Sequence, residues 1–277
     1  MILPFDILLN EIGTRLDIRT LIKLKITCTE LCQTISMEIL ERCCLLKVLT
    51  RLKGVFEDKF DAFMAELDRS GAIVSGSFLI QCILGEEWSS EKRDIDIYVD
   101  IKDKLVQVYK CATWNPTTQF ETWFFDNFLF TDVTDATQYL KLSSSIVWIR
   151  EFTFPKPGIA IPDRNFLGTA RDSQIDQTKP ILQIIDLDFN ETSMRRFEEI
   201  VPRQNFPKDI FEFIDLTFDF DVCKNTFGVR AGQPELRIKC LNQIVNKIST
   251  YSIPIELNRE KTESRKRKYV ERGFRFI

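Results

Sequence analysis

Two short motifs constrain this chain more than any other feature. Val74–Ser77 has the sequence Val-Ser-Gly-Ser, and Asp94–Val99 has the sequence Asp-Ile-Asp-Ile-Tyr-Val. Successive side chains of a strand point to opposite faces, so Asp94 and Asp96 share one face while apolar residues occupy the other. Two carboxylates about 7 Å apart at the backbone repel each other unless a cation or solvent relieves them. The pattern predicts a strand, a turn into a helix, and a second strand whose carboxylates can hold Mg²⁺.

Composition narrows the possible chemistry, because the 277 residues include no histidine. This excludes Ser-His-Asp and Cys-His triads, histidine zinc ligands and histidine general bases. The eight cysteines form no Cys-x-x-Cys pair, so we expect buried thiols rather than a zinc site. Asp6, Glu11 and Arg15 interrupt the apolar N-terminus, which argues against a signal peptide and a membrane span. We therefore expect an intracellular protein without a membrane partner.

Positive charge is concentrated near the C-terminus. Residues 259–277 contain eight Lys or Arg and three Glu, a net charge of +5, whereas the whole chain has −3 and the remainder therefore −8. The sequence predicts a basic C-terminal tail over 256–277, which indicates nucleic acid only weakly because the rest of the chain is acidic. The alternative is that Arg265–Lys268 forms a solvated face of a terminal helix.

The remaining pattern mixes helices and strands without strict alternation, which predicts an α+β fold. The expected helices cover 53–69, 78–84, 207–214 and 235–248, and the expected strands cover 72–75, 94–100, 146–154, 181–187 and 218–222. Gly71 and Gly85 are expected to end the first two of these helices.

The pattern of residues 1–50 predicts three short helices. Pro4 is expected in the first turn of the first helix, and Asp17 is expected as the N-cap of the second. The order Leu-Pro-x-x-Ile-Leu, Leu-x-x-Leu and Thr-Cys-x-x-Leu-Cys resembles an F-box. The matching residues are Leu3, Pro4, Ile7, Leu8, Ile12, Leu16, Leu21, Leu24, Cys28, Leu31 and Cys32. The resemblance implies an F-box-like helical module whose residues up to Leu16 bind the Skp-type adaptor of a cullin–RING ubiquitin ligase. The alternative is a helical cap on the larger domain.

The strand, Gly-Ser turn, helix and Asp-x-Asp strand, in this order, resemble the nucleotidyltransferase superfamily with the DNA polymerase beta-like fold. The resemblance implies a nucleotidyltransferase-like mixed sheet with flanking helices over 53–255. It implies that Asp94 and Asp96 are catalytic ligands of Mg²⁺, and that Gly76 and Ser77 bind the triphosphate of an NTP. The alternative is a solvated strand face with Ser77 as a helix N-cap.

The family also needs a third carboxylate on a neighbouring strand, and the sequence leaves its identity open. Gln183 occupies the centre of the strand at 181–187, where an aspartate is most expected. Glutamine is neutral and replaces a metal-binding carboxylate poorly, which weakens the expectation of catalysis. Asp186 is the best candidate for the third carboxylate and base. The other candidates are Asp188, Asp219 and Asp221.

Phe218–Asn225 and Lys268–Phe274, together with the two motifs, resemble nucleotidyltransferase-like proteins of large double-stranded DNA viruses of eukaryotes, some of which carry an F-box-like N-terminus. The first expected function is an adaptor protein in the host cytoplasm or nucleus, whose N-terminal module recruits a ubiquitin ligase and whose main domain binds the target. The second is a Mg²⁺-dependent nucleotidyltransferase that moves NMP from NTP to a hydroxyl. The third is a non-catalytic viral structural or host-interaction protein.

Overall fold

The computed structural model describes residues 15–27, 29–88, 94–101, 119–135, 146–161, 170–189, 207–252 and 259–277. The expected adaptor-binding residues Leu3, Pro4, Ile7, Leu8 and Ile12 lie outside these ranges. Among the described residues, no helix combines the length and the apolar character that crossing a bilayer requires.

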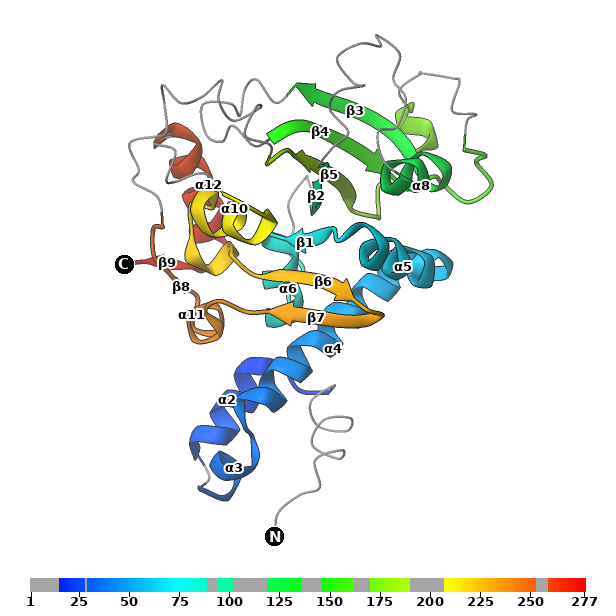
Figure 1. Cartoon of the computed structure of the whole chain (residues 1–277). Coiled ribbons are helices and arrows are strands. Elements are labelled where there is room, and N and C mark those ends of the chain that lie inside the picture. Colours follow the sequence, from blue (N-terminus) through cyan, green and yellow to red (C-terminus); the bar gives the residue numbers. More distant parts are fainter. Residues whose placement is uncertain are drawn as a thin grey trace.

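A mixed seven-stranded sheet forms the centre of the fold and confirms the expected α+β class (Figure 1). The strands are β1 Ile73–Ser75, β2 Asp94–Asp100, β3 Leu129–Asp135, β4 Ile146–Thr153, β5 Ile181–Leu187, β6 Thr226–Arg230 and β7 Gln233–Arg237. They lie in the order β3-β4-β5-β2-β1-β6-β7, with β2 and β5 parallel and the other pairs antiparallel. The strand with the two aspartates is therefore central, between β1 and β5.

Three helices cover one face of the sheet: α4 (Met37–Phe56), α5 (Phe60–Ser70) and α8 (Gln119–Asn127). The alternate β2 residues Ile95, Ile97 and Val99 pack in the same hydrophobic cluster as residues of these helices. Phe56 and Phe63 stack there with ring centres 3.9 Å apart. Each large apolar side chain buried in this way contributes about 1.5–3 kcal/mol, so period-two alternation in β2 fixes which face turns inward.

The opposite face carries α10 (Ile210–Thr217), whose apolar residues pack in one cluster with Tyr98 of β2. The ring centre of Phe213 lies 6.0 Å from that of Tyr98. Asp209 caps α10, because its side chain accepts a hydrogen bond from the backbone N–H of Glu212. Asp94 and Asp96 alternate with the inward-facing residues and therefore lie on the side of the sheet that α10 covers only in part.

Helix α6 (Ser77–Leu84) joins β1 to the rest of the core. It ends at Gly85 with φ +67°, and α5 ends at Gly71 with φ +69°, as the sequence predicted. A further hydrophobic cluster joins α6 to α2 (Ile18–Thr27), the first half of α4, the short helix α11 (Leu241–Asn246) and α12 (Arg259–Glu271). Asp17 caps α2 through Thr20, as predicted.

Helix α4 does not end where the N-terminal module was expected to end. It runs for 20 residues without interruption, so it crosses the boundary at 50–53 that the sequence suggested. The helix expected over 53–69 is split, since a 3-10 turn at Glu57–Lys59 precedes α5. The helix α3 (Thr29–Thr34) ends before Ser36, whose side chain caps α4. Apolar residues of α4 thus belong to two clusters, one near each end.

The predictions for two elements near the C-terminus, the strand at 218–222 and the helix at 235–248, are wrong. Residues 218–222 form an isolated bridge from Phe220 to Tyr251 and a 3-10 turn rather than a strand. The helix expected over 235–248 begins as strand β7 and becomes helical only at Leu241. The basic segment is helical at α12 and continues into a two-residue strand, with Tyr269 and Phe274 buried. One side of this segment packs onto the core, while Arg265, Arg267 and Lys268 are exposed, which agrees with the alternative of a terminal helix with a solvated basic face.

Candidate functional site

The Gly-Ser bend and the aspartate pair meet at one place. Ser75 pairs with Asp96 across β1 and β2, and the chain turns directly afterwards at Gly76 with φ +84°. A Cβ atom on Gly76 would lie only 2.6 Å from Oδ2 of Asp96. Glycine is therefore required twice at this position, once for the backbone angle and once for the close approach of a carboxylate.

Helix α6 starts immediately after this bend. Gly76 is its N-cap residue, and no side chain in the described part of the chain caps the helix. The alternative in which Ser77 acts as N-cap is therefore not found, since Ser77 is the first helical residue and is half-buried. The amide groups of the first helical turn have no partner within a helix, and they favour an anionic group at this end.

Asp94 and Asp96 are half-buried and share the face opposite the main core. Burial raises the pKa of Asp96 well above its ordinary value, and the charge of Asp94 raises it further. Burial also raises the pKa of Asp94, while the positive charges of Lys268 and Arg272 oppose that increase. Neither carboxylate forms an ion pair with a Lys or Arg in the described ranges. Such a pair gains free energy by taking up a proton or a cation.

The residue opposite the pair is Gln183, as the centre of the expected strand suggested. Gln183 pairs in register with Asp96, and Glu151 of β4 pairs with Gln183. The Gln183 side chain donates a hydrogen bond from Nε2 to Oε1 of Glu151 at 2.8 Å. Glu151 was not predicted as a site residue, although it is the one acidic residue in the expected strand at 146–154. Within the described ranges, no three Asp, Glu or Cys residues gather into a metal-binding group.

Asp186 lies on the other face of the sheet. It pairs in register with Val99, whose side chain belongs to the main hydrophobic core. Its buried carboxylate accepts a hydrogen bond from Arg150, which also donates to the buried Glu121. Burial raises the pKa of Asp186 well above its ordinary value, and the Arg150 charge opposes this. The structure therefore does not bring Asp186 together with Asp94 and Asp96, which corrects its assignment as third carboxylate and base.

The three other candidates for the third carboxylate, which are Asp188, Asp219 and Asp221, also lie away from the aspartate pair or bond to other groups. Asp188 follows the end of β5 that pairs with Asp100, which is the opposite end from Asp94. Asp219 accepts a hydrogen bond from Arg265 at 2.7 Å. Asp221 accepts one from Thr250 at 2.5 Å, and this bond contributes to a lowered pKa that burial opposes. None of them replaces the third carboxylate.

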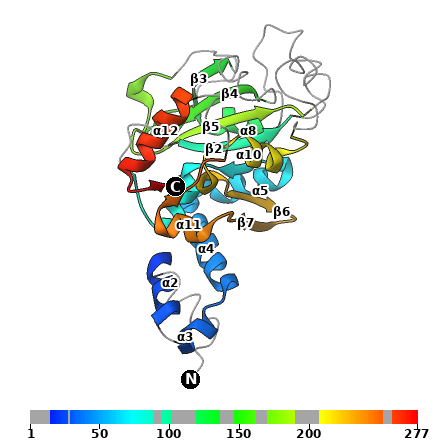
Figure 2. The same ribbon diagram turned by 90° about the vertical axis from the view of Figure 1, so that its left-hand side faces the viewer.

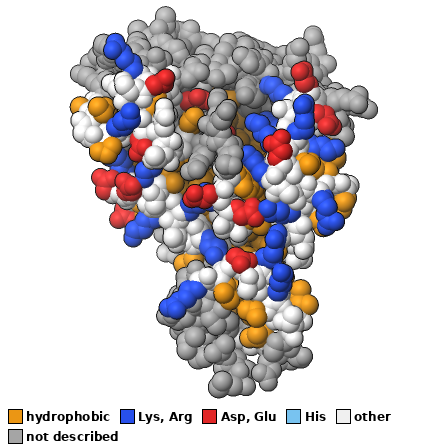
Figure 3. Space-filling view, turned by 180° about the vertical axis from the view of Figure 1, so that it is seen from behind, with side chains coloured by type: hydrophobic (Ala, Val, Ile, Leu, Met, Phe, Trp, Pro, Cys, Tyr) orange, Lys and Arg blue, Asp and Glu red, His pale blue; other side chains and the backbone are white. Residues whose placement is uncertain are grey.

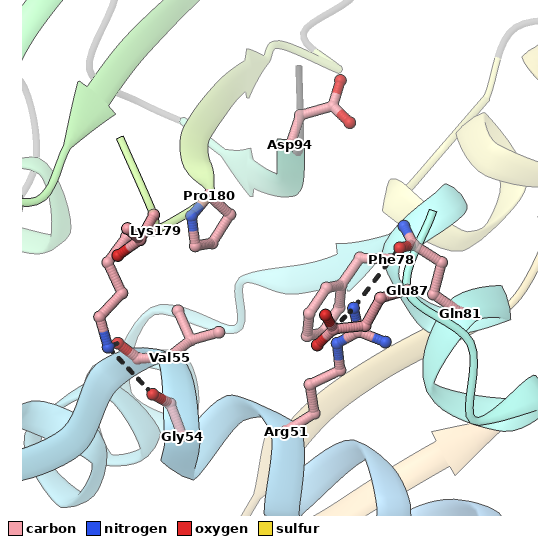
Figure 4. A pocket seen from close by; sticks show the side chains of 10 residues that line it. Arg51, Gly54, Val55, Phe78, Gln81, Glu87, Asp94, Lys179 and Pro180 are labelled. Atoms are coloured by element: carbon pink, nitrogen blue, oxygen red, sulfur yellow. Dashed lines mark hydrogen bonds and ion pairs between the residues drawn. The ribbon is translucent and has the colours of Figure 1, made fainter. Parts of the chain in front are cut away.

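A cavity of about 410 Å³ opens beside Asp94 (Figure 4). Its lining comprises Arg51, Gly54, Val55, Phe78, Gln81, Glu87, Asp94, Thr178, Lys179 and Pro180. The guanidinium of Arg51 lies 5.6 Å from the ring centre of Phe78, and Nζ of Lys179 donates to the carbonyl oxygen of Gly54 at 3.1 Å. The volume falls within the range of about 300–1,000 Å³ that ligand pockets occupy. No local pattern predicted this cavity, because its lining comes from separate segments of the chain.

No protein-family model matches this chain, and a search of the curated proteins gives no match either. The resemblances to the F-box and to the nucleotidyltransferases therefore stay predictions from the motifs quoted above. The geometry around Gly76, Asp94 and Asp96 is the basis on which a function can be proposed.

Proposed function

We propose that this protein binds a nucleoside triphosphate together with a divalent cation at Asp94 and Asp96. The observation that carries this proposal is the contact between Gly76 and Asp96, where a Cβ atom would lie 2.6 Å from the carboxylate. It brings an uncapped helix N-terminus and a carboxylate pair without a counter-ion to the same point. Those two features attract opposite charges, and a metal–triphosphate complex supplies both.

The residues present fit a hard divalent cation such as Mg²⁺. The carboxylates of Asp94 and Asp96 are the oxygen ligands that such a cation prefers. Burial raises the pKa of both carboxyl groups, so a bound cation would offset the free-energy cost of holding them ionised. The first turn of α6, beginning at Ser77, is placed to receive phosphate oxygens. A bound Mg²⁺ supplies charge neutralisation for the phosphate groups. The cavity beside Asp94 has room for the nucleoside part of the ligand.

Gln183 stands where the third metal-binding carboxylate was expected. This favours nucleotide binding over efficient transfer of a nucleotidyl group. Gln183 is neutral, and its amide group is already engaged by Glu151 at 2.8 Å. A neutral side chain neither balances a second metal ion nor accepts a proton from an attacking hydroxyl. We therefore propose a nucleotide-binding domain with slow transfer or none. An active transferase remains the rival function, and it would depend on Glu151 in place of a carboxylate at residue 183.

Calorimetry with Mg²⁺-ATP and Mg²⁺-GTP tests this proposal. We expect saturable binding that is lost in Asp94→Asn and Asp96→Asn, because the variants keep the shape of the side chains and remove their charge. Asp61→Asn is the matched control, since Asp61 is exposed on α5, a helix that packs on the opposite face of the sheet from the aspartate pair. Equal binding by all four proteins, or no binding by any, would contradict the proposal.

A second function is proposed for the N-terminal helices, namely docking of the Skp-type adaptor implied by the F-box resemblance. The observation in its favour is that α2, α3 and the first half of α4 project away from the sheet (Figures 1 and 2). Ile26 and Met37 in this projection are 77% and 48% exposed. A pull-down with the adaptor subunit tests it. Binding should disappear in Leu8→Ala with Ile12→Ala and persist in Lys23→Ala; a failure of the unchanged protein to bind would remove the proposal.

A further inference from the structure

A row of polar side chains crosses three strands on the face of the sheet that carries the aspartate pair. Asp96 of β2 pairs in register with Gln183 of β5, and Gln183 pairs in register with Glu151 of β4. Residues that pair in register on neighbouring strands have their side chains on the same face, about 5 Å apart. Strand pairing alone therefore places Gln183 between Asp96 and Glu151.

The hydrogen bond between Gln183 and Glu151 fixes which end of the amide group faces each neighbour. An ionised carboxylate only accepts hydrogen bonds, so the amide nitrogen Nε2 of Gln183 is the atom that donates to Oε1 of Glu151 at 2.8 Å. The oxygen and the nitrogen of an amide point in different directions. With its nitrogen held toward Glu151, the amide has its carbonyl oxygen turned away from that residue, and Asp96 is the neighbour on the other side.

This carbonyl oxygen is available to a ligand. Among the described residues, no donor bonds to Oε1 of Gln183, and the side chain is only half-buried. Glu151 forms no ion pair within the same ranges, and its carboxylate is used to hold the Gln183 amide. Hard divalent cations accept amide oxygens as ligands alongside carboxylates. The pair therefore has the form of an oriented oxygen ligand and the group that orients it.

We propose that Gln183 is the third protein ligand of a single divalent cation held by Asp94 and Asp96, and that Glu151 is the residue that positions Gln183. This rests on the function proposed above and adds a ligand, a positioning residue and the number of ions. Two carboxylates and a neutral amide carry two negative charges, which one divalent cation balances. A second cation finds no further counter-charge in the row, because the Glu151 carboxylate bonds to the amide nitrogen.

The charge pattern of the surface helps in counting bound ions. Figure 3 shows Lys and Arg side chains interspersed with Asp and Glu on the described part of the face that it presents. Basic groups close to exposed carboxylates weaken the attraction of those carboxylates for a cation. We therefore expect any adventitious binding to this surface to be weak and easily separated from a saturable site.

Electron paramagnetic resonance with Mn²⁺ alone counts the ions bound by the full chain. We expect one ion, lost in Asp94→Asn with Asp96→Asn. Gln183→Leu should weaken binding about tenfold, because it removes an oxygen ligand. Glu151→Met should have a similar effect, since groups that orient metal ligands contribute about tenfold or more to affinity. Glu235→Met is the matched control: it removes the same group from an exposed position on the edge strand β7 and should change affinity less than about twofold.

A conservative variant separates positioning from an effect of charge. Glu151→Gln removes the charge but keeps an oxygen that accepts the hydrogen bond from Gln183, so the affinity should stay within about threefold of that of the unchanged protein. A loss as large as that in Glu151→Met would show that Glu151 acts through its charge and would overturn its positioning role.

Exchanging the two side chains tests the number of ions. Gln183→Glu combined with Glu151→Gln keeps a hydrogen bond between the strands and the total charge, but it places a carboxylate next to Asp96. The number of bound Mn²⁺ ions should rise from one to two, and a count of one would contradict the argument from counter-charge. Because this variant and Glu151→Gln keep the cross-strand hydrogen bond, they test the proposal even if Gln183→Leu does not fold.

The outcomes distinguish this inference from the proposed function. If Mn²⁺ binds through Asp94 and Asp96 but Gln183→Leu and Glu151→Met behave like Glu235→Met, the inference alone fails. If Mg²⁺-ATP binds through the aspartates but Mn²⁺ alone does not, the three protein ligands are insufficient and again only the inference fails. If neither Mn²⁺ nor Mg²⁺-ATP binds, or if binding does not depend on the aspartates, both fail.

Discussion

Two charged clusters occupy opposite faces of the same sheet and differ in how their charge is balanced. On the core side, Arg150 bonds to both Glu121 and Asp186, and all three side chains are buried. On the other side, Asp94 and Asp96 have no cationic partner in the described part of the chain. In the first cluster the protein itself supplies the cation, one arginine that bonds to two buried carboxylates. The second has no such ion pair among the described residues, which is why we propose that it takes up a cation.

The largest effect is expected from breaking the core-side cluster. Arg150→Met should lower the free energy of unfolding by about 3–5 kcal/mol, because it leaves two buried carboxylates without their cation. Urea unfolding measures this change. A variant that also carries Glu121→Gln and Asp186→Asn should recover much of the loss, since no buried charge then remains unpaired. A loss below 1 kcal/mol for Arg150→Met would mean that the cluster is not compensated as described.

A smaller loss is expected at the bend that carries the aspartate pair. Gly76→Ala should cost about 2 kcal/mol, because φ is +84° and the new Cβ would lie 2.6 Å from Asp96. In the background of Asp96→Ala the cost should be lower, since only the backbone strain persists. A double-mutant cycle measured by urea unfolding gives the coupling, which we expect to be about 1 kcal/mol. Strict additivity would show that the contact with the carboxylate is unimportant.

Removing charge from the side of the sheet that carries Asp94 and Asp96 should change the stability in the opposite direction. Asp96→Asn should raise the free energy of unfolding by about 1 kcal/mol in the absence of divalent cations, because it ends repulsion with Asp94 and the desolvation of a charge. Thermal unfolding in EDTA measures this gain. The exposed control Asp61→Asn should change the stability by less than about 0.5 kcal/mol. Destabilisation by Asp96→Asn would assign the pair a structural role.

The smallest effect is a dependence of that gain on pH. The pKa of Asp96 is raised in the folded protein above the ordinary value of 3.8, so the folded state binds more protons than the unfolded state between those two values. The free energy of unfolding contributed by this residue therefore falls as pH rises through that window. Asp96→Asn should match the unchanged protein near pH 4 and exceed it progressively toward neutral pH. Parallel stability curves for the two proteins would contradict a raised pKa.

Much of the central fold followed from local pattern. The strands at 94–100 and 181–187 were predicted with the bounds that the structure shows, and Gly71 and Gly85 end helices as expected. These segments have a strong apolar period or a residue suited to a left-handed turn, so their neighbours along the chain suffice to define them. The same holds for the prediction that Asp94 and Asp96 share a face.

The region after residue 217 was predicted poorly for a physical reason. The alternation in Phe218–Val222 resembles a strand, but Asp219 and Asp221 bond to Arg265, Thr250 and Ser252 from much later segments. The hairpin β6–β7 was missed, although its turn residues Ala231 and Gly232 both have positive φ and Gly232 was visible in the sequence. Glu235 was read as helical because its strand is exposed on alternate residues and lacks a strong apolar signal.

The sequence alone determined the two motifs, the strand that carries them and the side of that strand on which the aspartates lie, because side-chain direction repeats along a single strand. Only the tertiary structure decided which groups face the pair. Strand register placed Gln183 beside Asp96 and sent Asp186 to the opposite face, and the contacts of Tyr269 with Trp88 and Cys223 decided where α12 packs. Those neighbours come from segments far apart in the chain, and no local pattern encodes their distance.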